Sequence, residues 1–146
     1  MCTSGGTFAL PTAGAAELTD KTYTGSMSAI TSGDHTVSAG DVTIDASGYT
    51  GNVNYQAPLF KNQNGNINID IADGKTLTVK GFNGKGDTSV SADQFNGIER
   101  ATLYAYNRYP AGSDIAMTFT GGNIVVSNEY KGSSTLDLYG LFALSL

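Results

Sequence analysis

The sequence predicts an all-β fold, and within that class an irregular right-handed parallel β-helix (β-solenoid), with a β-sandwich as the alternative architecture. Three observations support this prediction. Apolar and polar residues alternate with a period of two in several short segments, as they do in half-buried strands. Gly, Asn or Asp stands at nearly every corner between these segments. The 146 residues include 19 glycines but only 3 prolines, which favours one domain with many tight turns.

The chain begins with a stretch that has no strand pattern. Residues 1–20 are mostly small, polar and aperiodic, so we expect a flexible N-terminal segment there. Residues 21–146 are expected to form a single all-β domain. Its first short strands are predicted within residues 23–45, with turns at Gly33-Asp34 and at Gly40-Asp41.

The clearest strand pattern of the chain lies within residues 65–81, which read GNINIDIADGKTLTVKG. Isoleucines alternate with Asn and Asp in the first half, and Leu77 and Val79 alternate with threonines in the second. Asp73-Gly74 separates the two halves. Two strand segments with apolar faces, and a tight corner between them, are therefore predicted.

This corner has two interpretations. In a hairpin, a three-residue loop would place Ile69 opposite Leu77 and Ile67 opposite Val79, with all four on one face. In a solenoid, residues 73–75 would form a corner where the chain turns onto the next sheet. Both sets of aliphatic side chains would then point into one central stack.

Later segments repeat this arrangement and favour the solenoid. Paired strand clusters recur at 37–44, 67–79 and 115–126, and in part at 136–144, while a further strand is predicted at 101–106. No strict period is present, which excludes a regular hexapeptide solenoid. An irregular β-helix of roughly 20–25 residues per coil would give five or six turns.

The C-terminal residues are unusually apolar for the end of a domain. The large apolar side chains there are Leu136, Leu138, Leu141, Phe142, Leu144 and Leu146. A solenoid needs a polar cap on its last coil, and long apolar edges pair with other chains. We therefore expect 21–146 to be a fragment of a longer solenoid. The alternatives are self-association through the apolar C-terminal strand and a C-terminal end that folds back onto the domain.

Composition excludes several classes of function. Charged residues make up 14% of the chain, the net charge is -5, and the few basic residues are scattered, so no nucleic-acid partner is expected. No apolar run approaches the roughly 20 residues of a membrane span. Cys2 is the only cysteine, so no internal disulfide can form. A surface of Thr, Ser, Asn and Gly is typical of secreted or cell-surface β proteins.

Three segments resemble coils of bacterial autotransporter passenger domains, namely 66–70 (NINID), 73–79 (DGKTLTV) and 121–128 (GGNIVVSN). The resemblance covers residues 36–146. It implies a right-handed parallel β-helix displayed at the outer membrane of a Gram-negative cell, acting as an adhesin or self-associating factor. The translocator barrel of that family is not in the sequence, so the resemblance implies a passenger fragment. The family shares no common site, and no functional residue is carried over.

No catalytic, metal or cofactor signature is present. His35 is the only histidine, and it is expected to be a polar residue of the turn at Gly33-Asp34. His35, Cys2 and the scattered carboxylates have no metal-ligand spacing. Segment 84–86 (GKG) lacks the remaining residues of a phosphate-binding loop. We therefore predict a protein without enzymatic activity, cofactor or metal.

The best binding candidate is a cluster of tyrosines with one arginine. Tyr104, Tyr106 and Arg108 share one strand face if the strand continues, and Tyr109 follows them. Exposed tyrosines offer contact area for sugars or proteins. Alternatively they form an ordinary solvent-side ladder, with Leu103 pointing inward.

These observations predict an extracellular structural and adhesive domain at a bacterial cell surface, which mediates cell–cell or host contact. The expected partners are surface proteins or glycans of the host or of other bacteria. The alternatives are a carbohydrate- or protein-binding β-sandwich and a β-helical polysaccharide-degrading enzyme.

Overall fold

The computed structural model describes residues 14–25, 28–49, 59–62, 65–81, 101–107, 116–128 and 139–145. Its strands are β1 (Ala16–Glu17), β2 (Lys21–Thr22), β3 (Gly33–Val37), β4 (Val42–Asp45), β5 (Phe60–Lys61), β6 (Ile67–Lys80), β7 (Ala101–Asn107), β8 (Met117–Ser127) and β9 (Tyr139–Ser145). All their pairings are parallel. Among the described residues, no helix has the length and hydrophobicity needed to cross a membrane. The prediction of an all-β fold is confirmed.

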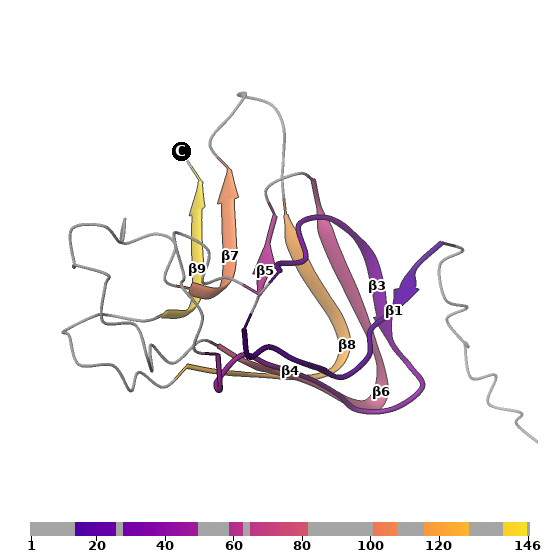
Figure 1. Ribbon diagram of the computed structural model, residues 1–146. Helices are drawn as coiled ribbons and strands as arrows, with labels where there is room; N and C mark the ends of the chain where they lie inside the picture. Colours follow the sequence, from indigo (N-terminus) through magenta and orange to yellow (C-terminus); the bar gives the residue numbers. More distant parts are fainter. Residues whose placement is uncertain are drawn as a thin grey trace, which may run out of the picture.

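Strand β6 is the centre of the larger sheet. On one side its first half pairs with β3, with Ile67 opposite Gly33, and its second half pairs with β4, with Leu77 opposite Val42. On the other side β8 runs along both halves of β6, and the register shifts at the bend between Ile71 and Thr76. Figure 1 shows β6 and β8 curling together around one corner of the molecule.

The hairpin interpretation of residues 65–81 is wrong. Ile69 does not face Leu77 but lies opposite His35 on one neighbouring strand and Phe119 on the other. The chain bends between the two halves of β6, and Gly74 there has φ of 75°, a left-handed value that favours glycine. Both halves bury their aliphatic residues, as the corner interpretation expected.

The strands form three parallel stacks. The first stack contains β1, β3 and the first halves of β6 and β8, and the second contains β2, β4 and the second halves of β6 and β8. The third contains β5, β7 and β9, and Ile30 joins it through a bridge to Phe60. Along the chain the stacks are visited in the order first, second, third, and then the first again. In Figure 1 they form three sides around the core.

The spacing of the stacked strands differs from the expected 20–25 residues per coil. Ala16 pairs with His35, 19 positions later; Gly33 pairs with Ile67, 34 positions later; and Ile67 pairs with Met117, 50 positions later. The expected recurrence of 37–44, 67–79 and 115–126 is confirmed for the described residues, because the strand residues of these segments pair side by side in β3, β4, β6 and β8. Residue 115 lies outside the described residues. The described part of 136–144 lies in β9, which pairs with β7 in the third stack.

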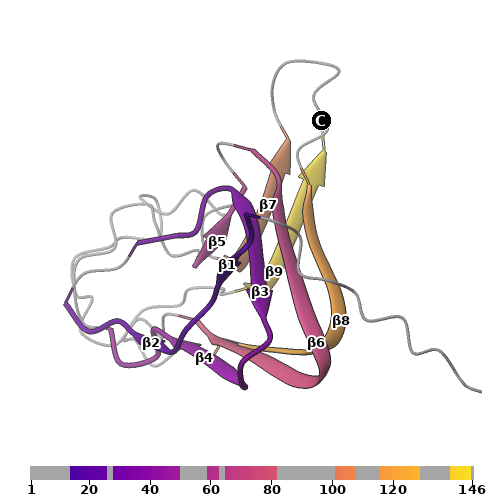
Figure 2. The same ribbon diagram turned by 90° about the vertical axis from the view of Figure 1, so that its right-hand side faces the viewer.

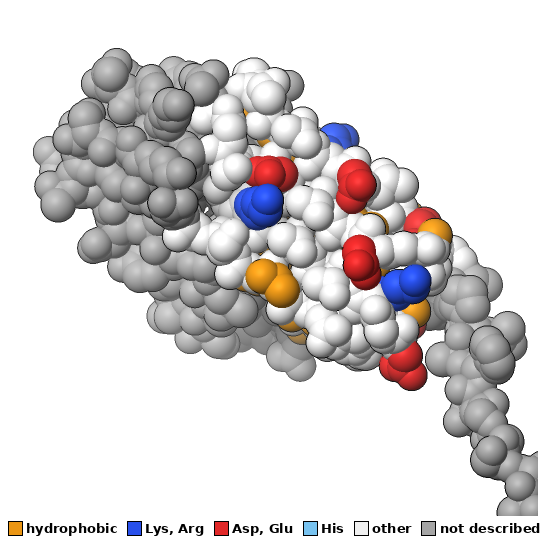
Figure 3. Space-filling model, turned by 90° about the horizontal axis from the view of Figure 1, so that it is seen from below, with side chains coloured by type: hydrophobic (Ala, Val, Ile, Leu, Met, Phe, Trp, Pro, Cys, Tyr) orange, Lys and Arg blue, Asp and Glu red, His pale blue; other side chains and the backbone are white. Residues whose placement is uncertain are grey.

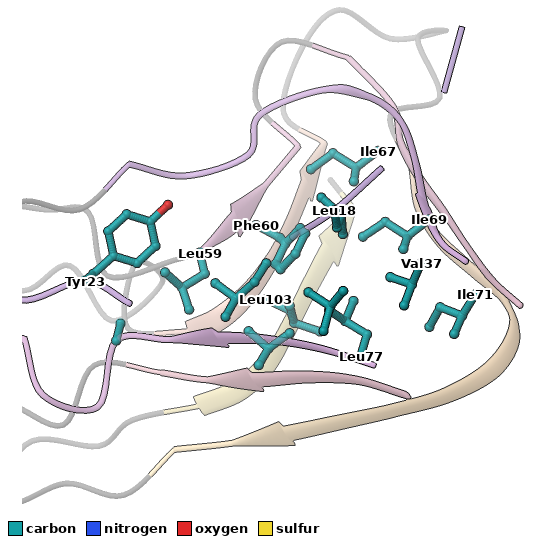
Figure 4. Close-up of a cluster of buried hydrophobic side chains, with 14 of the residues drawn as sticks. Leu18, Tyr23, Val37, Leu59, Phe60, Ile67, Ile69, Ile71, Leu77 and Leu103 are labelled. Atoms are coloured by element: carbon teal, nitrogen blue, oxygen red, sulfur yellow. The ribbon is translucent and has the colours of Figure 1, made fainter. Parts of the chain in front are cut away.

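Aliphatic side chains from all three stacks fill the interior. Ile67, Ile69, Ile71, Leu77 and Val79 of β6 are at most 2% exposed. Figure 4 shows Ile67, Ile69, Ile71 and Leu77 with Phe60 and Leu103 in the space that the strands enclose. The ring of Phe60 packs edge-on against Phe119, with centroids 6.4 Å apart, and so joins the third stack to the first. Burial of each such side chain stabilises the fold by about 1.5–3 kcal/mol.

The described structure begins before the expected domain boundary at residue 21. Ala16 and Glu17 form β1 beside β3, and the backbone N–H of Leu18 donates to the carbonyl of Thr36 at 2.8 Å. The Leu18 side chain is buried in the core. Within residues 14–20, Ala16 and Glu17 are therefore part of the larger sheet and Leu18 is part of the core, and residues 1–13 lie outside the described residues.

Candidate functional site

The outward side chains of the first stack form a polar ladder. Its members are Asp34, Thr36, Asn68, Asp70, Thr118 and Thr120. Among them Thr36 is only 7% exposed, and its hydroxyl donates to Glu17. Successive side chains of a strand point to opposite faces, so burial of the isoleucines of β6 turns Asn68 and Asp70 outward. The parallel register then places like positions of β3, β6 and β8 side by side. The ladder is thus a direct consequence of the alternation in the sequence and of the strand register.

Hydrogen bonds run across the strands of the polar ladder. The Asn68 Nδ2 donates to Asp34 Oδ1 at 2.8 Å. Two residues further along β6, Asp70 Oδ1 accepts a hydrogen bond from the Thr120 hydroxyl at 2.9 Å. Each bond joins neighbouring strands, so it restrains two side chains at once. The ladder therefore presents oxygen acceptors and hydroxyl donors in restrained positions.

A shallow hollow of about 320 Å³ lies on this face. All six polar ladder residues line it, together with Ala15, His35 and Ile69. Its lining contains two carboxylates, one amide and three hydroxyls but no Lys or Arg. This size is at the lower end of small-molecule sites, and the lining can both donate and accept hydrogen bonds. The hollow is therefore suited to a neutral, hydroxyl-rich or a cationic group, and it disfavours an anion.

Glu17 anchors the edge of the polar ladder. Its Oε1 accepts hydrogen bonds from the backbone N–H groups of Ser38 (2.7 Å) and Ala39 (2.9 Å). Its Oε2 accepts hydrogen bonds from the hydroxyls of Thr36 and Ser38. The hydrogen bond from Ala39, followed by those from Thr36 and Ser38, lowers the pKa of Glu17 to about 2. Glu17 is therefore a fixed anion at neutral pH, and its role is to hold the turn after β3.

Other polar corner residues also link one strand layer to the next. In each case a side-chain oxygen accepts the backbone N–H of a residue in the next layer, close to where a strand or strand half begins. The three bonds are Thr43 N–H to Asp20 (2.7 Å), Thr76 N–H to Asp41 (2.9 Å) and Ala116 N–H to Asn66 (2.9 Å). Sequence reasoning assigned Asp41 only to a turn and missed these links. The available signal was an Asp directly before each of two strands, at 20–21 and 41–42.

His35 is a strand residue, which corrects the prediction that it lies in a turn. It belongs to β3, opposite Ile69, and its Nε2 lies 3.2 Å from the carbonyl oxygen of Ser32. Pairing with β6 has overridden the local turn signal of Gly33-Asp34. His35 is half-buried and lines the hollow, but the lining contains no Ser or Cys nucleophile beside it.

The predicted tyrosine cluster lies on another stack. Tyr104 and Tyr106 are residues of β7 in the third stack, opposite Lys61 and Leu144 respectively. Arg108 and Tyr109 lie outside the described residues, so this site remains a prediction. Leu103 lies in β7, between β5 and β9. It is 2% exposed and points into the core, as the ladder alternative expected. The polar ladder lies on the first stack and does not include this cluster.

Similarity to known proteins does not assign a function to the polar ladder, and neither does a group of metal ligands among the described residues. Comparisons with protein-family models, with curated proteins and with solved structures found no match for the chain. Within the described ranges, no group of three or more His, Cys, Asp or Glu residues is placed to hold a metal ion. The functional argument therefore rests on the geometry of the polar ladder.

Proposed function

We propose that this chain is an extracellular structural and adhesive domain, built as an irregular right-handed parallel β-helix of the autotransporter-passenger kind. The ordered return of the chain to three parallel stacks supports this architecture. Figure 2 shows β1, β3, β6 and β8 of the first stack lying side by side. The domain would contact other bacterial cells or a host surface through an outward sheet face.

The polar ladder with its hollow is the observation that carries this proposal. The outward side chains of a purely structural sheet need only be polar enough to keep the protein soluble. Here, by contrast, Asp34 and Asp70 are held in place by hydrogen bonds to neighbouring strands, and both line the hollow. Carboxylate, amide and hydroxyl groups pair well with the hydroxyls of a sugar. The preferred partner is therefore a surface glycan.

The second stack provides the contrasting surface. Figure 3 views it from below and shows a largely uncharged face with a few scattered acidic and basic side chains, some of which lie next to each other. One of its charges is paired, because Lys80 Nζ lies 3.4 Å from Asp45 Oδ2. Outward residues of this stack, such as Thr78, can serve as matched controls for the polar ladder.

Glycan-array binding and cell-binding assays test the adhesive function. Asp34→Asn with Thr118→Val removes one charge and one hydroxyl from the hollow while side-chain shape is kept. We expect a loss of binding of at least about tenfold, because polar groups of the ligand lose their partners. The control Thr78→Val should bind like the unchanged chain. Equal binding by all three proteins, or no binding to any glycan or cell, would contradict the proposal.

A polysaccharide-degrading enzyme is the second candidate, and a specific feature favours it. Asp34 and Asp70 lie on neighbouring strands, and both line the hollow. Glycoside hydrolysis uses two carboxyl groups on either side of the scissile bond. Release of reducing ends in an unbiased polysaccharide screen, abolished by both Asp34→Asn and Asp70→Asn, would favour this candidate. Binding without turnover would favour adhesion.

A further inference from the structure

The hollow on the first stack is elongated across the strands. Along a strand it reaches only from one outward position to the next, such as from Asp34 to Thr36, which is about 7 Å at the usual rise of a strand. Across the strands it extends from Ala15, directly before β1, through β3 and β6 to Thr118 and Thr120 of β8. At the usual spacing between strands this is about 14 Å. The hollow is therefore about twice as long across the sheet as along it.

Two rows of outward side chains form the long walls of the hollow. Each wall contains one side chain from each of β3, β6 and β8, in register. The first wall is Asp34, Asn68 and Thr118, and the second wall is Thr36, Asp70 and Thr120. His35 and Ile69 lie between the walls and complete the lining with Ala15. A ligand that fills the hollow is therefore a narrow chain, which runs in the direction in which the strands are stacked.

The two carboxylates of the hollow are on opposite walls and in different strands. Asp34 belongs to the first wall in β3, and Asp70 belongs to the second wall in β6. Along the hollow they are thus one strand spacing apart, about 4.8 Å. Each accepts one hydrogen bond on Oδ1, from Asn68 and Thr120 respectively. Within the described part of the chain the Oδ2 atoms accept none, so they can accept hydrogen bonds from a ligand.

Neither of these carboxylates is paired with a cation within the described part of the chain. The lining of the hollow contains no Lys or Arg. On the second stack, by contrast, Asp45 is paired with Lys80 at 3.4 Å. Hydrogen bonds between an ammonium group and a carboxylate are shorter and stronger than those between neutral groups. The hollow therefore favours a chain that carries positive charges on alternate sides.

We infer that the hollow binds an unbranched chain of β-1,4-linked amino sugars, with successive protonated amines on Asp34 and Asp70. In such a chain each residue is turned by about half a turn from the one before, so equivalent substituents point to alternate sides. One residue is about as long as the strand spacing of about 4.8 Å. Successive amines therefore match both the alternation and the spacing of the two carboxylates. The inference rests on the proposed glycan-binding function and specifies its ligand.

Calorimetric titration with β-1,4-linked glucosamine oligomers of one to six residues tests this ligand. The fully N-acetylated oligomers are the matched comparison, because acetylation removes the charge and keeps the chain. We expect the glucosamine trimer to bind at least about tenfold more tightly than its acetylated counterpart, and added salt should reduce this preference. Affinity should rise at least about tenfold from one residue to three and then level off, since three residues fill about 14 Å.

Single substitutions test which side chains hold the amines. Asp34→Asn and Asp70→Asn each remove one charge, keep the side-chain shape and keep an acceptor for the hydrogen bond within the polar ladder. Each should reduce the preference for the glucosamine trimer at least about threefold. The control Asp73→Asn removes an equal charge at the bend of β6, outside the hollow, and should keep the preference. Far-UV circular dichroism checks that each variant keeps its strand content.

The outcomes separate this inference from the proposed function. Equal affinity for the charged and the acetylated trimers would overturn the inference, and so would a single residue that binds as tightly as the trimer. A preference that survives in Asp34→Asn and Asp70→Asn, or that Asp73→Asn reduces equally, would also overturn it. Binding to other glycans but to none of these oligomers would overturn the inference and leave the adhesive function standing. No binding to any glycan or cell would contradict both.

Discussion

Single glycines determine how closely neighbouring strands follow each other around the bend. Gly121 has φ of 73°, and a Cβ added there would lie 2.1 Å from the carbonyl oxygen of Ile71. Gly74, at the same bend in β6, has φ of 75°, but an added Cβ would meet nothing within 4 Å. Both positions have a left-handed backbone that would strain any other residue, but only Gly121 has a neighbouring atom that an added Cβ would clash with.

This difference predicts unequal costs for two alanine substitutions. Gly74→Ala should lower the free energy of unfolding by about 1–2 kcal/mol, the cost of a left-handed conformation for a residue with a Cβ. Gly121→Ala should cost clearly more, because β8 must also move away from the backbone of Ile71. Urea unfolding of both variants measures the difference. Equal costs would show that β8 does not approach β6 as closely as described.

The lowered pKa of Glu17 predicts how the free energy of unfolding depends on pH. Its folded-state pKa of about 2 lies below its ordinary value of 4.5. Glu17 therefore contributes stability above about pH 4.5, and this contribution is lost as pH falls from there towards 2. The Glu17→Gln variant should be less stable at pH 7 by at most about 1 kcal/mol, since the side chain is exposed to solvent. The difference should shrink by pH 3 in urea unfolding.

Asp45 also makes stability depend on pH, but it does so equally in the unchanged chain and in the Glu17→Gln variant. Partial burial alone would raise the pKa of Asp45, yet the hydrogen bonds from Ser47 and the ion pair with Lys80 outweigh it, and the pKa is lowered. Asp45 therefore also loses stabilising contacts in acid, in the unchanged chain and in Glu17→Gln alike. A stability difference between these two proteins that stays constant from pH 7 to pH 3 would contradict the role given to Glu17.

At the scale of elements, the register between β4 and β6 can be tested by paired cysteines. Thr43 lies opposite Thr78, and both point outward from the second stack. Their Cα atoms are about 4.8 Å apart in such a ladder, within the range of a disulfide. With Cys2 replaced by Ser, Thr43→Cys with Thr78→Cys should oxidise readily to an intramolecular disulfide. Mass spectrometry after mild oxidation measures the product.

The control for this register moves one cysteine along the strand. Thr76 also faces outward but lies two residues before Thr78, so Thr43→Cys with Thr76→Cys should form the disulfide much more slowly. Comparable yields from the two pairs would exclude the described register. A β-sandwich with antiparallel pairing of these segments would not favour the first pair over the second.

At the scale of the whole molecule, burial falls towards the β8 end of the stacks. Leu77 is fully buried between Val42 and Ile124, whereas Ile124 is 37% exposed. Leu77→Ala should therefore cost about 2–5 kcal/mol, and Ile124→Ala less than half as much, because a partly exposed site leaves a smaller cavity. Urea unfolding tests both. Similar costs would mean that another part of the chain covers Ile124.

The sequence by itself determined the strand class, the inward positions and the corners. Ile67, Ile69 and Ile71 were predicted to share an apolar face, and they are buried because alternation with a period of two is a local property of a strand. The paired segments at 37–44, 67–79 and 115–126 were also recognised from local patterns. The polar ladder follows from these patterns only once the register is known.

Only the tertiary structure decided which strands are neighbours. The local pattern of residues 67–80 is the same in a hairpin and in a bend, and only the repetition of paired segments elsewhere in the chain favoured the bend. The partners of the first half of β6 lie 34 positions earlier and 50 positions later in the chain, and no local signal specifies such distances. For the same reason His35 was assigned to a turn, and the roles of Asp20 and Asp41 were missed. Contacts between distant segments selected one arrangement, in which the aliphatic rows of β3, β4 and β6 are buried in one core.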